Sequence, residues 1–284
     1  MVIRGSSDEE DEIMLPTIAV IGSGTMGEAL IKGLLRLSLI EPQNIIGTDP
    51  WHERLELLKA RYKIRVSSDN VPAVEAADIV FLSIKPQVMN AVLDEIRDHI
   101  KPEALIFSIA AGVPVKTIRQ GTGMESVIRA MPNTPAQIGQ GITMWTATEA
   151  VTDQQRQHAL TILGALGEEI YVDDEHYLDM ATALSGTGPA YVYLFMEALV
   201  DAGVHLGFSR HISQKLVFQT VIGAANFAQQ SDMHLATLRN QVTSPGGTTA
   251  EALYHLEKGG FRTVLSRAIW AAYVRSAELG RDKE

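Results

Sequence analysis

Short apolar runs alternate with amphipathic stretches through the first half of the chain. The runs have the length and composition of buried strands, and the stretches between them have the spacing of helices. Strands that alternate with helices predict right-handed parallel crossovers and a doubly wound α/β sheet. The strands are expected at residues 17–21, 44–48, 64–66, 77–84, 104–110 and 127–131.

Beyond about Asp174 the pattern changes to one helix after another. Pro189 suits the first position of a long apolar helix that continues through Ala202, and Ser209 suits the N-cap of the next helix. The apolar faces of these helices predict a packed core and, by extension, a helical dimer interface, because such faces are not left in water. Further helices are expected at 179–184, 235–242, 250–258 and 261–279.

The first strand runs directly into a glycine-rich motif that opens a helix. The motif is Gly22-Ser23-Gly24-Thr25-Met26-Gly27, a G-x-G-x-x-G between a strand and a helix. This context predicts a dinucleotide-binding loop. Gly22 permits the tight turn, Gly24 lets a pyrophosphate approach the backbone, and Gly27 lets the helix pack on the sheet.

Asp49 ends the second predicted strand, about 20 residues past the motif, where an acid can hold the adenosine ribose hydroxyls. Such an acid repels a ribose 2′-phosphate, so it favours NAD(H) over NADP(H). Two alternatives stay open. His52 and Arg54 lie just beyond and could accept the phosphate, and Asp49 could simply cap the helix that starts near Trp51.

Other polar and turn residues follow the later strands. Ligands of doubly wound sheets collect beyond the carboxyl ends of the strands, so these positions are candidate cofactor contacts. A lysine directly after an apolar strand is also an ordinary solvated end. The candidates directly after the strands are Lys85, Pro86, Ala111, Gly112, Pro132, Asn133 and Thr134, and Ile84 and Ala110, the last residues of two predicted strands, are included as cofactor contacts.

The predicted organisation is an N-terminal Rossmann-like sheet followed by an all-α C-terminal domain for dimerisation and substrate binding. We place an acidic tail at 1–13, the dinucleotide-binding domain at 14–174 and the helical domain at 175–284. The tail carries five acids and one base with few apolar groups. This composition predicts a disordered, solvated segment, and an interaction tail is the alternative.

Composition narrows the classes of function. The 284-residue chain has a formal net charge of −10 and no cysteine. The charge disfavours nonspecific binding to nucleic acid or an anionic membrane, and the lack of cysteine excludes disulfides and thiol nucleophiles. The eight histidines show no metal-site spacing, so we expect no metal. No apolar run reaches membrane-spanning length, and we expect a soluble cytoplasmic protein.

A second candidate anion site lies far from the nucleotide motif, at Ser244-Pro245-Gly246-Gly247-Thr248-Thr249. The glycines let the backbone approach a ligand, and the threonines open a helix whose first amides are unpaired. Thr248 and Glu251 have capping-box spacing, which supports a helix start here. A carboxylate or phosphate suits such a helix end. The alternative is a plain loop-to-helix junction.

These motifs together resemble the pyrroline-5-carboxylate reductases, and the resemblance runs from about Thr17 to Leu279. The stretches that carry it are GSGTMG (22–27), SDN (68–70), KPQ (85–87), AAGV (110–113), AMPNTP (130–135), SGTGPAY (185–191) and VTSPGGTTAEALYHLEKGGFR (242–262). One position departs from the family. Many bacterial members carry a pair suited to NADPH where this chain has Asp49-Pro50, which agrees with a slight preference for NADH.

The resemblance implies reduction of the cyclic imine pyrroline-5-carboxylate to proline, with NADH or NADPH as cofactor. It implies that amides of Gly246, Gly247, Thr248 and Thr249, with Ser244, bind the substrate carboxylate. It places Thr249 on the ring nitrogen, Asn70 on a cofactor ribose, and Lys85, Pro132 and Asn133 beneath the nicotinamide. Thr249 and Lys85 are the predicted catalytic residues. It also implies a homodimer, or a larger assembly of dimers, through interleaved helical domains.

Two other functions remain as alternatives. Related imine- or hydroxyacid-reducing enzymes place a lysine or aspartate in the first long helix of the second domain. Here that stretch offers only Ser185, Thr187 and Tyr191. A catalytically silent paralogue should have lost part of the substrate loop, whereas residues 244–249 are complete.

Overall fold

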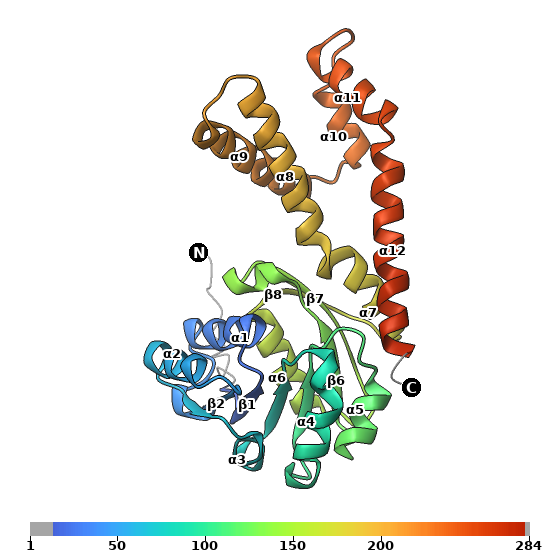
Figure 1. The fold of residues 1–284 in the computed structure, drawn as a ribbon. Helices are drawn as coiled ribbons and strands as arrows, with labels where there is room; N and C mark the ends of the chain where they lie inside the picture. Colours follow the sequence, from blue (N-terminus) through green and yellow to red (C-terminus); the bar gives the residue numbers. More distant parts are fainter. Residues whose placement is uncertain (1–13, 282–284) are drawn as a thin grey trace, which may run out of the picture. The chain divides into compact units, whose positions relative to one another are not determined.

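The computed structural model describes residues 14–281, so the predicted acidic tail lies outside the described residues. Its N-terminal part is built on one mostly parallel sheet (Figure 1). Across the sheet the strands are β3 (Arg65–Ser67), β2 (Ile45–Thr48), β1 (Ile18–Ile21), β4 (Ile79–Leu82), β5 (Leu105–Ser108), β6 (Val127–Met131), β7 (Gly141–Ala147) and β8 (Gly167–Tyr171). The six predicted strands are confirmed with small shifts at their ends.

Helices cover both faces of this sheet. One face packs on α1 (Thr25–Arg36), α2 (His52–Tyr62) and α6 (Asp153–Gly164), and the other on α3 (Asn70–Ala76), α4 (Met89–Ile96) and α5 (Val115–Thr122). Successive residues of a strand serve the two faces alternately, as pleating requires: Ile18 and Val20 lie in one core and Ala19 and Ile21 in the other. The doubly wound arrangement predicted from the alternation is therefore confirmed.

The far edge of the sheet departs from a purely parallel pattern. Strand β7 runs antiparallel to β6, and β8 then pairs in parallel with β7. A short connection containing the 3-10 turn η4 (Thr134–Ile138) separates β6 from β7, and such a link is too short for a parallel crossover. Neither β7 nor β8 was among the predicted strands.

The described chain divides into two compact units. One contains residues 14–186 together with the end of the last helix from Tyr273, and the other contains Thr187–Ala272. Side-chain contacts explain why the end of α12 (Phe261–Arg281) belongs to the first unit. The Ser276 hydroxyl donates to Asp179 at 3.1 Å, and the Tyr273 hydroxyl lies 3.0 Å from His176 Nε2. The functional division at residue 174 stays a prediction.

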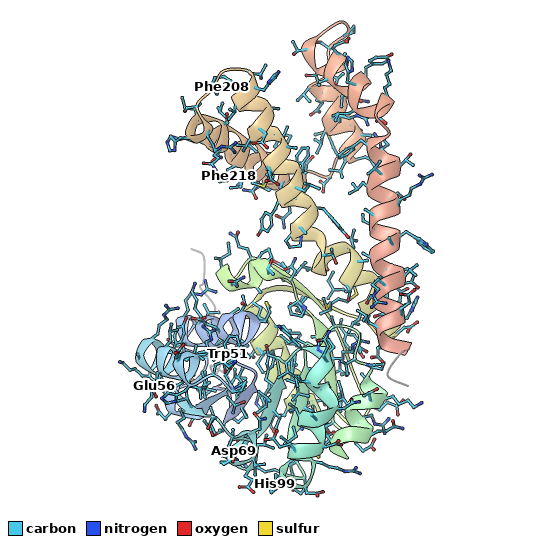
Figure 2. The ribbon with its side chains drawn as sticks, viewed as in Figure 1. Trp51, Glu56, Asp69, His99, Phe208 and Phe218 are labelled. Atoms are coloured by element: carbon cyan, nitrogen blue, oxygen red, sulfur yellow. The ribbon has the colours of Figure 1, made fainter. Side chains whose placement is uncertain are left out.

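The second unit is entirely helical. It contains α8 (Gly188–His205), α9 (Arg210–Gln229), α10 (Leu235–Gln241), α11 (Thr248–Lys258) and the first part of α12. The N-cap role of Ser209 is confirmed, because its side chain accepts the Ile212 amide. Helix α8 begins at Gly188, one residue before the predicted Pro189. Large apolar side chains of α8, α9 and the turn between them remain exposed, including Phe208 in that turn and Phe218 in α9 (Figure 2).

None of the described helices combines the length and the apolar character needed to span a bilayer.

Candidate functional site

The glycine-rich loop has the geometry that its motif predicts. Gly22 adopts φ +83°, a left-handed conformation that side-chain-bearing residues rarely take. A Cβ on Gly27 would lie 2.5 Å from the Gly22 carbonyl oxygen and 3.1 Å from Val20 in β1. Helix α1 can therefore approach the loop and the sheet only if residue 27 is glycine.

Gly24 differs from the other two glycines. A Cβ built on it would meet no atom of the described residues within 4 Å. The space beside Gly24 is thus open, as expected where a ligand and not the protein must approach the backbone. Gly24 is also the N-cap of α1 and makes no side-chain cap hydrogen bond, so the first amides of the helix are free to bind an anion.

Two amides of the loop have a structural role instead. The Gly22 and Ser23 amides both donate to the Thr48 carbonyl oxygen, at 3.1 and 2.9 Å. The Ser23 side chain is fully buried, and Met26 packs against the core. Anion-binding amides must therefore come from the start of α1, where Thr25 is exposed.

The end of β2 brings two predicted residues to the same edge. Asp49 accepts the Trp51 amide at 3.0 Å, while the N-cap of α2 is Trp51 with no side-chain cap hydrogen bond. Asp49 therefore forms the turn before α2 and does not cap the helix. Asn70, the first residue of α3, accepts the Thr48 hydroxyl at 2.6 Å and donates to Glu95 at 2.9 Å.

Arg54, one of the residues that could accept a phosphate, is held on the loop itself. Its Nε donates to the Ser23 carbonyl at 2.8 Å, and its Nη2 donates to the Gly24 carbonyl at 3.2 Å. The same Nη2 forms a 2.7 Å ion pair with Glu28 in the first turn of α1. The sequence reading missed Glu28. The signal that could have found it is an acid in the first turn of α1 combined with arginines two turns apart on α2.

Glu28 binds two more donors from α2. Arg61 donates to its Oε1 at 2.7 Å and the Tyr62 hydroxyl donates at 2.8 Å. Burial alone would raise the pKa of Glu28, but the hydrogen bonds from Tyr62, Arg54 and Arg61 hold its pKa below the ordinary value. Glu28 is therefore ionised at neutral pH.

A groove of about 750 Å³ follows the outer face of α1 beside these groups. Trp51, labelled in Figure 2, projects from the turn before α2 and is 73% exposed. Gly24, whose face is open, is one of the residues that line the groove. Its lining residues are Gly24, Thr25, Glu28, Ala29, Lys32, Asp49, Trp51, Arg54, Arg61, Tyr62, Gln137 and Ile138.

The remaining cofactor candidates lie at the carboxyl edge of the same sheet, because β1, β2, β4, β5 and β6 are all parallel. Ile84 packs beside Gly22, since a Cβ there would lie 2.6 Å from Ile84 Cγ2. Lys85 is exposed and precedes a 3-10 turn that starts at Pro86. Ala110 and Pro132 are buried, and Asn133 accepts the Ile142 amide at 3.0 Å.

The second anion-site candidate lies between α10 and α11. Gly246 adopts φ +69°, and the Gly247 amide donates to the Ser244 carbonyl at 3.1 Å. Helix α11 (Thr248–Lys258) starts two residues before the predicted range 250–258, so both threonines lie in its first turn. The predicted capping box is wrong, because the N-cap is Gly247, which has no side chain, and no side-chain cap bond forms. The Glu251 carboxylate instead lies 3.3 Å from His255 Nε2.

The uncapped start of α11 has a chemical consequence. The amides at Thr248 and Thr249 have no intrahelical partner by virtue of their position, and the N-cap Gly247 makes no side-chain cap hydrogen bond. The loop therefore keeps the amides available to an anion, as the threonine-glycine pattern suggested.

Residues 185–191 offer few side chains that could donate a proton to the substrate. The Ser185 hydroxyl donates to the Ala181 carbonyl at 3.0 Å within a π-helical turn, Thr182–Gly186. No lysine or carboxylate belongs to the stretch.

Comparisons with known proteins cover nearly the whole chain. The family model "Pyrroline-5-carboxylate reductase dimerisation" matches residues 175–279, and "NADP oxidoreductase coenzyme F420-dependent" matches residues 17–112. The chain is 41% identical over 264 residues to pyrroline-5-carboxylate reductase of Synechocystis sp., covering 93% of this chain and 98% of that protein. It is 42% identical over 265 residues to that of Pseudomonas aeruginosa, covering 93% and 97%.

A solved structure gives the same result. The crystal structure of Plasmodium falciparum pyrroline carboxylate reductase, with NADP bound, aligns with a TM-score of 0.87 at 32% identity. The alignment covers 94% of this chain and 99% of that chain.

Proposed function

The chain belongs to the pyrroline-5-carboxylate reductase family, and on this premise we propose that it reduces pyrroline-5-carboxylate to L-proline, the last step of proline biosynthesis, with NADH as the preferred cofactor. We assign this activity because the chain is similar over nearly its full length to reductases of this name. Both binding loops required for it are present in full, at residues 22–27 and 244–249.

The nucleotide loop fits an NAD(P)H cofactor. The open face of Gly24 and the free amides at the start of α1 suit the pyrophosphate, and Asn70 suits a ribose. Ile84, Lys85, Pro86, Ala110, Pro132 and Asn133 stand at the edge where the nicotinamide would lie. When bound, the nicotinamide supplies the hydride.

The second loop suits the substrate carboxylate. Amides of Thr248 and Thr249 would bind it. Ser244, Gly246 and Gly247 would shape the turn, since the Gly247 amide already donates to the Ser244 carbonyl. The Thr249 hydroxyl would hydrogen-bond the ring nitrogen and orient the C=N bond. A protonated imine is already electrophilic, so catalysis needs mainly orientation. The exposed Lys85 is the second candidate for a catalytic role, as a cation at the cofactor edge.

Two features support the preference for NADH. Asp49 places a carboxylate where it would repel a ribose 2′-phosphate. Arg54, one of the two nearby basic residues that could offset the repulsion, is bonded to the loop carbonyls and to Glu28. The NADP in the Plasmodium structure belongs to that protein and leaves the preference of this chain to experiment.

Removing the Asp49 charge should raise the NADPH/NADH ratio of kcat/KM by about tenfold, equivalent to about 1.4 kcal/mol. Both Asp49→Ser and Asp49→Asn remove the like charge. Asn retains an acceptor for the Trp51 amide, so this variant removes the charge while keeping the hydrogen bond that forms the turn. Steady-state kinetics with both cofactors measures the ratio. An unchanged ratio in both variants would leave Asp49 with a turn-forming role only.

The activity itself is tested by following nicotinamide absorbance with pyrroline-5-carboxylate, in parallel with NADH and NADPH. Substrate-dependent oxidation is the expected result, faster with NADH. Folded protein that oxidises neither cofactor would favour the related-enzyme or silent-paralogue alternatives.

The helical C-terminal region is also the part of the chain that we expect to form the oligomer. We assign residues 175–284 to dimerisation and substrate binding and residues 14–174 to the cofactor. The dimerisation model matches 175–279, and α8 and α9 carry exposed apolar side chains that one unit does not bury. A homodimer, or a larger assembly of dimers, would cover them.

A further inference from the structure

Glu28 is the meeting point of three donors from α2. Its carboxylate accepts Arg54 Nη2 at 2.7 Å, Arg61 Nη1 at 2.7 Å and the Tyr62 hydroxyl at 2.8 Å. The side chain is only 18% exposed. Because the carboxylate belongs to the first turn of α1, it lies next to the loop that would hold the cofactor phosphates.

The position of Arg54 depends on this carboxylate. Two of its three guanidinium nitrogens are used: Nε by the Ser23 carbonyl, and Nη2 by the Gly24 carbonyl and Glu28. Arg61 is held by the same carboxylate two turns further along α2. Both cations line the groove that also contains Trp51 and Asp49, the residue at which the cofactor ribose is expected.

We propose that Glu28 is a positioning residue for cofactor specificity: by holding Arg54 and Arg61 it keeps their positive charge from a ribose 2′-phosphate, and so supports the NADH preference that Asp49 begins. The inference rests on the proposed cofactor site. It adds a determinant in α1, outside the loop after β2 to which this discrimination was assigned above.

Glu28 weakens the binding of a 2′-phosphate in two ways. Its own negative charge repels an additional phosphate, and its ion pairs occupy the donors that a phosphate would need. Neutralising Glu28 relieves both. A merely structural role, in which Glu28 only fastens α2 to α1, predicts instead that all nucleotides lose affinity together.

The test compares 2′,5′-ADP with 5′-AMP, because the two differ only in the 2′-phosphate and require no turnover. In Glu28→Gln, calorimetry should show 2′,5′-ADP binding tighter by roughly five- to tenfold, with 5′-AMP changed by less than about twofold. The double variant Glu28→Gln/Arg54→Ala should lose most of the gain, because the released guanidinium is absent. Tyr62→Phe is the matched control: it removes one donor to Glu28 and leaves Arg54 in place, so the ratio should not change.

Arg54→Ala alone gives an independent reading that does not depend on the folding of Glu28→Gln. If Arg54 is withheld from the phosphate, this variant should keep the 2′,5′-ADP/5′-AMP affinity ratio of the unaltered protein. A selective loss of 2′,5′-ADP would show that Arg54 already binds the phosphate and would overturn the inference. So would an unchanged ratio in Glu28→Gln. Failure of the unaltered protein to bind NADH would overturn the proposed cofactor site and the inference with it.

Discussion

Thr249→Val should lower kcat by roughly a hundredfold while the affinity for NADH changes little. Valine has nearly the shape of threonine but cannot hydrogen-bond the ring nitrogen. The backbone amide of residue 249, which we assign to the substrate carboxylate, is retained at the uncapped start of α11. The loss should therefore fall on orientation and proton supply in the reacting imine. Steady-state kinetics and NADH titration measure the two quantities separately.

Thr249→Ser is the matched control, because it restores the hydroxyl without the methyl group and should recover most of the activity. An NADH affinity that falls as far as kcat would contradict the assignment of this loop to the substrate. Equal loss in the serine variant would point to packing of the methyl group and not to the hydroxyl.

The parts of the fold that the sequence predicted are those where local pattern and tertiary role agree. Strands β1 and β4 are buried on both faces, so they appear as unbroken apolar runs. Strand β7 alternates buried and partly exposed residues, and its antiparallel direction depends on the short link after β6. No local signal in the sequence defines that direction.

The same distinction holds in the candidate site. The glycine motif requires specific residues at fixed spacing, and the geometry at Gly22 and Gly27 follows from it. The capping box was mispredicted because Gly247 can adopt the N-cap conformation and moves Thr248 inside the helix. The contacts of Glu28 join residues separated by 26 or more positions, so they arise only once α2 has packed beside α1.

Gly24→Val should weaken NADH binding by roughly a hundredfold and leave the stability of the fold nearly unchanged. A Cβ at residue 24 would meet no described protein atom within 4 Å, so the larger side chain costs the folded protein little. The same side chain would occupy the space through which the pyrophosphate approaches the first amides of α1. Fluorescence titration with NADH and thermal unfolding measure the two effects.

Gly27→Ala supplies the contrast, because it places a smaller group in a closed position. Its Cβ would lie 2.5 Å from the Gly22 carbonyl, so the loop or α1 must move, and we expect a lower midpoint of thermal unfolding together with weaker binding. The two variants should thus separate the glycine that admits the ligand from the glycine that lets the helix pack. If Gly24→Val lowered the unfolding midpoint as much as Gly27→Ala, the open face of Gly24 would belong to the packing of the loop and the cofactor assignment would lose its structural support.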